Sequence, residues 1–104
     1  LEIVPALIAE FLGTLLFVYV FLFLSTIKKT AGNLFYGLAI GFTLMAIIYT
    51  FADVSGGAFN PAIGLGITMA NFTSWETIWI FPVANFSGGV LAAFLSQYVN
   101  GPEA

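Results

Sequence analysis

The chain has 104 residues, of which 61% are hydrophobic and only 7% are charged, with a net charge of -3. A soluble domain carries about 25% charged residues, so this composition predicts an integral membrane protein. Two basic residues exclude an electrostatic nucleic-acid interface. The absence of cysteine and histidine removes disulfides, the usual metal ligands and the commonest general base, so we expect no metal, no cofactor and no enzyme activity.

Three apolar runs are long enough to cross a bilayer, at about 5–27, 34–52 and 76–99. About 20 helical residues cover a hydrocarbon core of ~30 Å. The two basic residues, Lys28 and Lys29, lie between the first two runs. A short basic loop is usually cytoplasmic. We therefore expect this loop in the cytoplasm and the segment between the second and third spans on the outer side.

The segment 55–70 contains helix breakers at membrane depth. Asn60 is a good N-cap, and Pro61 suits the first helical position. A helix from Pro61 to about Ala70 would be ~15 Å long, half of the bilayer. Irregular backbone survives at this depth only where it is buried in protein or lines a water-filled cavity. The sequence therefore predicts a re-entrant loop and half-helix over 55–70.

A half-helix that begins in mid-membrane has distinctive electrostatics. Its first N–H groups lack internal partners, and the macrodipole places about half a positive charge there. Asn60 adds amide donors, and the carbonyls of Gly57, Ala58 and Phe59 can offer acceptors along the approach. This pattern indicates a pore wall for water or small hydroxylated solutes. The alternative from the residues alone is a loop that plugs a structural bundle.

Two polar residues and two stripes of small residues interrupt the apolar spans. A charge inside a span, here Glu10, is costly and usually functional, and Asn85 is expected to face the bundle interior. Small residues four positions apart let helices approach closely. The two stripes are Gly37 and Gly41 in the second span, and Ala84, Gly88 and Ala92 in the third.

Four motifs resemble the aquaporin (major intrinsic protein) family: AEFLGT at 9–14, LAIGFT at 38–43, GGAFNPA at 56–62 and VANFSGGVLAA at 83–93. The resemblance implies a single all-α half-unit over 1–104, with three transmembrane helices and one re-entrant half-helix. Asn60, Pro61 and Ala62 would be its pore motif. Glu10 would support the loop by accepting hydrogen bonds from loop N–H groups. The implied partners are the lipid bilayer, the other half of the channel and three further copies in a homotetramer.

The expected function is a passive channel for water and/or small neutral solutes such as glycerol, urea or ammonia. The resemblance slightly favours the second half of the family fold, where an arginine usually follows Asn-Pro-Ala. Here Ile63 takes that place, and Ile48 lies about where a filter histidine often sits, so both are selectivity-filter candidates. If the chain is a first half, Ile63 carries no such meaning. The alternative functions are a non-conducting subunit of a larger membrane complex and, less favoured, a secondary transporter with a broken helix.

Overall fold

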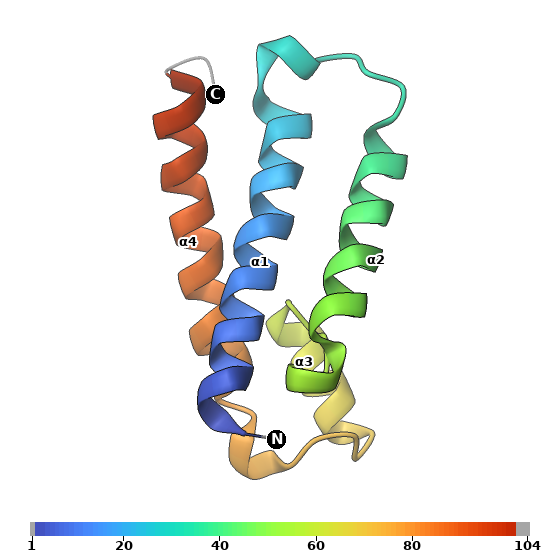
Figure 1. The fold of residues 1–104 in the computed structure, drawn as a ribbon, viewed down its shortest axis with the longest axis vertical. Helices are drawn as coiled ribbons and strands as arrows, with labels where there is room; N and C mark the ends of the chain where they lie inside the picture. Colours follow the sequence, from blue (N-terminus) through green and yellow to red (C-terminus); the bar gives the residue numbers. More distant parts are fainter. Residues whose placement is uncertain (1, 102–104) are drawn as a thin grey trace.

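Three long helices run side by side, and a shorter one lies beside one end of the bundle (Figure 1). The computed structural model describes residues 2–101; Leu1 and residues 102–104 of the predicted unit lie outside this range. Within it, the helices are α1 (Ile3–Thr26), α2 (Tyr36–Ser55), α3 (Pro61–Met69) and α4 (Ile80–Asn100), with 3-10 turns at Lys28–Thr30 and Trp75–Thr77. The predicted all-α class is confirmed.

The long helices match the length of a membrane. The segments Ile3–Thr26, Tyr36–Ser55 and Trp75–Asn100 are each long and apolar enough to cross a bilayer. Helix α1 packs against both α2 and α4, while α3 packs against α4. The Lys28–Thr30 turn lies at one end of the bundle and the loop that follows α3 at the other (Figure 1). The predicted orientation, with the lysine turn in the cytoplasm, stays a prediction.

The stripe of small residues on α4 forms the contact with α1. Ala84, Gly88 and Ala92 are all buried. A Cβ atom at position 88 would lie 2.6 Å from the backbone oxygen of Phe11, so the two helices meet backbone to backbone here. The second stripe behaves differently. Gly37 and Gly41 are exposed, and a Cβ at either position would meet no atom of the described residues within 4 Å.

Local hydrogen bonds set the two ends of α2. The Asn33 side chain accepts a hydrogen bond from the N–H of Phe35 at 3.0 Å, which holds 33–35 in a turn, and the helix begins at Tyr36 instead of 34. At the other end, Gly56 takes a left-handed conformation with φ 95°, and its N–H donates to the Ala52 carbonyl at 2.8 Å. This is a common helix ending. It carries α2 to Ser55, beyond the predicted end at 52.

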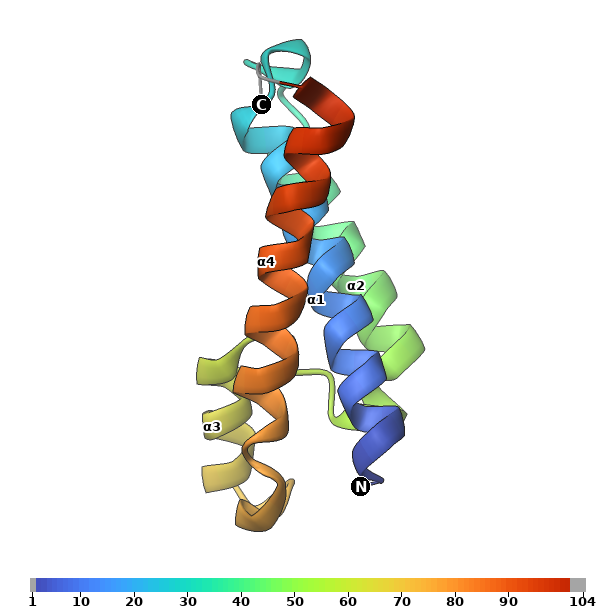
Figure 2. The ribbon, with the colours of Figure 1, turned by 90° about the vertical axis from the view of Figure 1, so that its left-hand side faces the viewer.

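An asparagine flanks each end of helix α3. The Asn60 Oδ1 accepts the N–H of Ala62 at 2.8 Å, and Pro61 takes the first helical position. Asn71 adopts φ 68°, and the N–H of Phe72 closes the last turn on the Ile67 carbonyl at 2.9 Å. Nine residues at ~1.5 Å each reach about halfway across the hydrocarbon core. In Figure 2, α3 accordingly lies beside only the lower part of α4.

Candidate pore site

Glu10, on α1, accepts hydrogen bonds that hold the loop preceding α3. Its side chain is fully buried. Oε1 accepts hydrogen bonds from the N–H of Phe59 at 2.8 Å and from Nδ2 of Asn85 at 3.1 Å, and Oε2 accepts from Oγ of Ser55 at 2.5 Å. These neutral donors come from the loop, α4 and the end of α2. A single carboxyl group therefore ties all these segments to α1.

Thr14 makes a second connection between α1, α4 and the loop. Its Oγ1 donates to the Phe59 carbonyl at 3.3 Å and accepts from Nδ2 of Asn85 at 2.9 Å. Oδ1 of Asn85 is buried and has no hydrogen-bond partner among residues 2–101. Thr14 and Ser55 were not among the residues singled out from the sequence. For Thr14 a signal existed, because it follows Glu10 by four residues and so shares its helix face.

Phe59 holds an unusual backbone conformation just before the pore motif. Its φ is 55°, in the left-handed region that bulky residues rarely adopt. Its ring occupies the space that a side chain at Gly13 would need. The ring also meets Phe51 edge-on, with centroids 6.3 Å apart. The peptide before Asn60 is therefore held on several sides at once.

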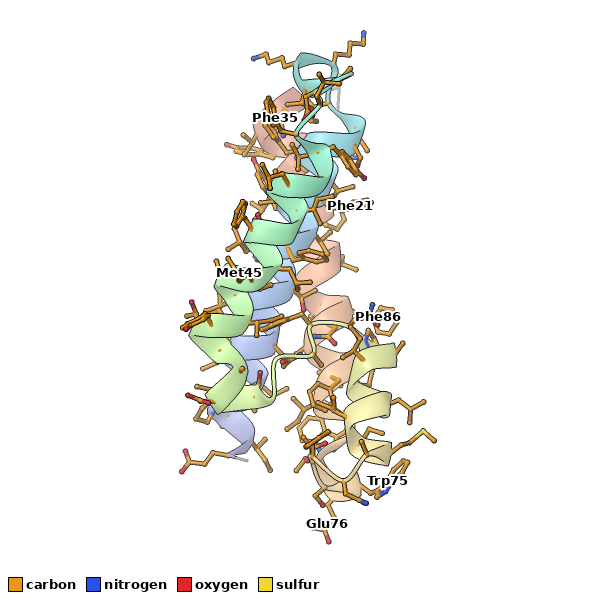
Figure 3. All side chains as sticks on the ribbon, turned by 90° about the vertical axis from the view of Figure 1, so that its right-hand side faces the viewer. Phe21, Phe35, Met45, Trp75, Glu76 and Phe86 are labelled. Atoms are coloured by element: carbon orange, nitrogen blue, oxygen red, sulfur yellow. The ribbon has the colours of Figure 1, made fainter. Side chains whose placement is uncertain are left out.

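The predicted pore residues take different positions. Asn60 is exposed. Its Oδ1 caps α3, whereas its Nδ2 has no hydrogen-bond partner within residues 2–101. Ala62 is exposed beside it. The filter candidates Ile63 and Ile48 are 51% and 39% exposed, on α3 and α2 respectively. These helices lie on opposite sides of the connecting loop (Figure 3).

The three predicted pore carbonyls also differ. The carbonyls of Gly57 and Ala58 accept no hydrogen bond from the described residues, whereas that of Phe59 accepts one from Thr14. Gly57 has φ 71°, a conformation that glycine adopts freely. Its N–H donates to Oγ of Ser55 at 3.2 Å. The loop thus leaves two acceptors free immediately before the half-helix.

Two hollows flank α3. A groove of about 430 Å³ lies where α3 begins, lined mainly by apolar groups that include Val18, Pro61, Phe86 and Val90, with Asn60 and Asn85 among its few polar ones. A polar cavity of about 690 Å³ lies beyond the other end of α3, where Asp53, Asn71, Ser74 and Glu76 are among its lining residues. Within residues 2–101, no acidic side chains group together in a way that could hold a metal ion.

Comparison with known proteins identifies the family. The family described as Major intrinsic protein matches residues 1–102. Aquaporin-B of Dictyostelium discoideum is 36% identical over 89% of this chain, and Aquaporin-8 of Rattus norvegicus is 35% identical over 92%. The alignments cover only 33% and 37% of those relatives, so the chain spans about a third of their length. No solved structure matches. The chain is a membrane protein that belongs to the major intrinsic protein family.

Proposed function

We propose that this chain forms part of a passive transmembrane channel for water and/or small neutral solutes. The observation that carries the proposal is the half-helix α3, which begins at Asn60-Pro61 beside the bundle, after a loop that Glu10 braces. Backbone N–H groups at its start and the free Nδ2 of Asn60 can donate hydrogen bonds to a passing molecule. The names of the relatives support the same function.

The electrostatics of the site favour neutral molecules over cations. The start of α3 carries about half a positive charge, which repels cations at that depth. The carboxyl group that could offset it, that of Glu10, is fully buried and already accepts three hydrogen bonds. It is therefore placed to hold the loop and not to bind a permeating ion. We accordingly assign Glu10 a supporting role instead of a proton-relay role.

Stopped-flow swelling of proteoliposomes tests the function directly. The complete protein, reconstituted and exposed to an osmotic step, should let water through faster than protein-free vesicles do. The activation energy of water flux should be low, because each permeating water molecule exchanges its hydrogen bonds to bulk water for hydrogen bonds to the donors and acceptors of the pore wall. Water flux equal to that of empty vesicles would contradict the proposal and favour the non-conducting subunit.

The identity of residue 63 leads to a prediction about solute selectivity. If the chain forms the second half of the family fold, the aliphatic side chain adds no charged group beside the start of α3, so we expect glycerol to pass as well as water. Ile63→Arg should lower glycerol flux about tenfold, because a bulky charged group fills the path, while water flux falls less. Ile63→Leu is the matched control and should keep both fluxes. Equal water-to-glycerol ratios in the Arg and Leu variants would show that residue 63 does not select the solute.

We also propose that the other half of the channel covers the groove beside Asn60. Phe86 and Val90, which line this groove, are 65% and 56% exposed. The polar groups of Asn60 and Asn85 in this groove suit contact with another helix-rich unit better than contact with lipid, because lipid tails offer them no hydrogen-bond partner. Cross-linking from a photoreactive group at position 90 should reach protein and not only lipid. A homotetramer, which the family resemblance implies, should appear as a fourfold mass in native mass spectrometry.

A further inference from the structure

We propose that Thr14 is a positioning residue of the pore: its hydroxyl turns the Phe59 carbonyl away from the permeation path and so sets the place of Asn60. The inference rests on the proposed channel function and concerns how the loop presents its acceptors. Phe59 has a left-handed backbone conformation, which is uncommon for a large side chain. Such a conformation persists only where the surroundings impose it.

The restraints on the Phe59 backbone come from one short stretch of α1. Glu10 accepts its N–H at 2.8 Å, Gly13 leaves room for its ring, and Thr14 donates to its carbonyl at 3.3 Å. The side chain is 4% exposed, so it is held within this contact. One helical turn of α1 therefore determines the orientation of both peptide groups that flank Phe59.

Asn85 determines the direction in which the Thr14 hydroxyl points. Nδ2 of Asn85 can only donate, and it lies 2.9 Å from Oγ1 of Thr14. The hydroxyl oxygen is therefore the acceptor in that bond, and its single proton remains free for the Phe59 carbonyl. A relay of hydrogen bonds therefore runs from Asn85 through Thr14 to the loop: Nδ2 of Asn85 donates to Oγ1 of Thr14, and the Thr14 hydroxyl donates to the Phe59 carbonyl.

The relay separates the acceptors of the loop from its donors. The carbonyls of Gly57 and Ala58 stay free, the Phe59 carbonyl is occupied, and the next polar group is the free Nδ2 of Asn60. If the Thr14 hydroxyl is removed, the Phe59 carbonyl becomes a buried acceptor without a partner. The peptide between Phe59 and Asn60 then gains by rotating toward another donor, which displaces the Asn60 amide from its place.

The test compares Thr14→Val, which keeps the shape and removes the hydroxyl, with Thr14→Ser, which keeps the hydroxyl. Thr26→Val is the matched control, because the Thr26 hydroxyl, on the same helix, bonds within residues 2–101 only to the Leu22 carbonyl of its own helix. The complete protein is reconstituted, and flux is expressed per folded channel. We expect Thr14→Val to lower water permeability about fivefold, the factor that corresponds to the loss of one buried hydrogen bond. We also expect it to change the ratio of water permeability to glycerol permeability.

A purely structural role would reduce the number of folded channels but leave the ratio and the flux per channel unchanged. That result for Thr14→Val, or equal loss in Thr14→Ser, would overturn the proposal. If Thr14→Val does not fold, Thr14→Cys keeps the size with a weaker donor and should shift the ratio in the same direction. An unchanged ratio in that variant would also overturn the proposal.

A second readout separates this inference from the channel function itself. Phe followed by Asn occurs once in the sequence, at 59–60. Labelling Phe carbonyl carbons with ¹³C and Asn nitrogens with ¹⁵N therefore gives this chain a single carbonyl–nitrogen correlation in solid-state NMR. If the wild-type protein conducts nothing, the channel proposal fails, yet this signal still tests whether Thr14 positions the Phe59–Asn60 peptide. It should move in Thr14→Val and stay in Thr14→Ser, and an unmoved signal in Thr14→Val would refute the positioning role of Thr14.

Discussion

Glu10→Leu is expected to remove most of the folded, conducting protein. The substitution takes away the acceptor of three buried donors, namely Phe59 N–H, Asn85 Nδ2 and Ser55 Oγ. Each buried donor left without a partner costs about 1–3 kcal/mol. The Ser55 hydroxyl can turn to the Phe51 carbonyl, 3.4 Å away, so two donors stay unpaired. Their cost is at least ~2 kcal/mol, a large part of the ~5–15 kcal/mol by which proteins are typically stable. Thermal stability in detergent, followed by size-exclusion chromatography, measures the loss.

Glu10→Gln is the matched control for this prediction. Its amide oxygen can still accept from Phe59 and Asn85, while its nitrogen can donate to Oγ of Ser55. The Ser55 hydroxyl proton then turns to the Phe51 carbonyl, 3.4 Å away. We expect a loss of only about 1 kcal/mol and retained water flux. If Gln and Leu destabilise the protein equally, Glu10 contributes through its charge and not through its acceptor geometry.

Gly88→Ala is expected to separate α4 from α1. The new Cβ would lie 2.6 Å from the Phe11 oxygen and 3.2 Å from the Leu15 nitrogen, and both are backbone atoms that cannot rotate away. Overpacking of this kind costs about 1–3 kcal/mol. The displacement also stretches the contacts that Asn85, one turn earlier, makes to Glu10 and Thr14. Both thermal stability and water permeability should therefore fall.

The neighbouring glycine supplies the control. A Cβ at Gly89 would have its nearest contact at 4.0 Å, from a methyl carbon of Val18. Gly89→Ala should therefore be neutral, or more stable by up to ~1 kcal/mol because alanine favours helix. If Gly88→Ala and Gly89→Ala had the same melting temperature, α1 and α4 would be able to adjust their spacing freely. The structure predicts instead that, of these two positions, 88 does not tolerate alanine and 89 does.

Sequence patterns predicted the helices well because the signals involved are local. A run of apolar residues long enough for the bilayer, the cap at Asn60 and the proline after it each act within a few residues. The ends of α2 show the limit of such patterns. Asn33 delayed the start through a side-chain bond to Phe35, and Gly56 delayed the end, so the predicted 34–52 became Tyr36–Ser55.

The two small-residue stripes show why packing could not be predicted in the same way. Both had the spacing that allows close helix contact. In the structure, α1 covers the stripe at Gly88, whereas no described residue covers Gly37 or Gly41. Spacing says that a helix can approach, but the identity of the approaching helix depends on how the whole chain is arranged.

By itself, the sequence determined the membrane class, the all-α fold, the half-helix that begins at Asn60-Pro61 and a buried carboxyl group at Glu10. The family resemblance implied that this group accepts hydrogen bonds from the loop, and tertiary structure alone decided which donors it accepts. Its bonds join residues 45, 49 and 75 positions apart, and the roles of Ser55 and Thr14 appear only once those segments meet. The same holds for the Phe59 carbonyl, which looked like a pore acceptor in sequence and is bonded to Thr14 in the fold. The physical reason is that a buried polar group must find a partner, and in this protein its partner lies on a distant segment.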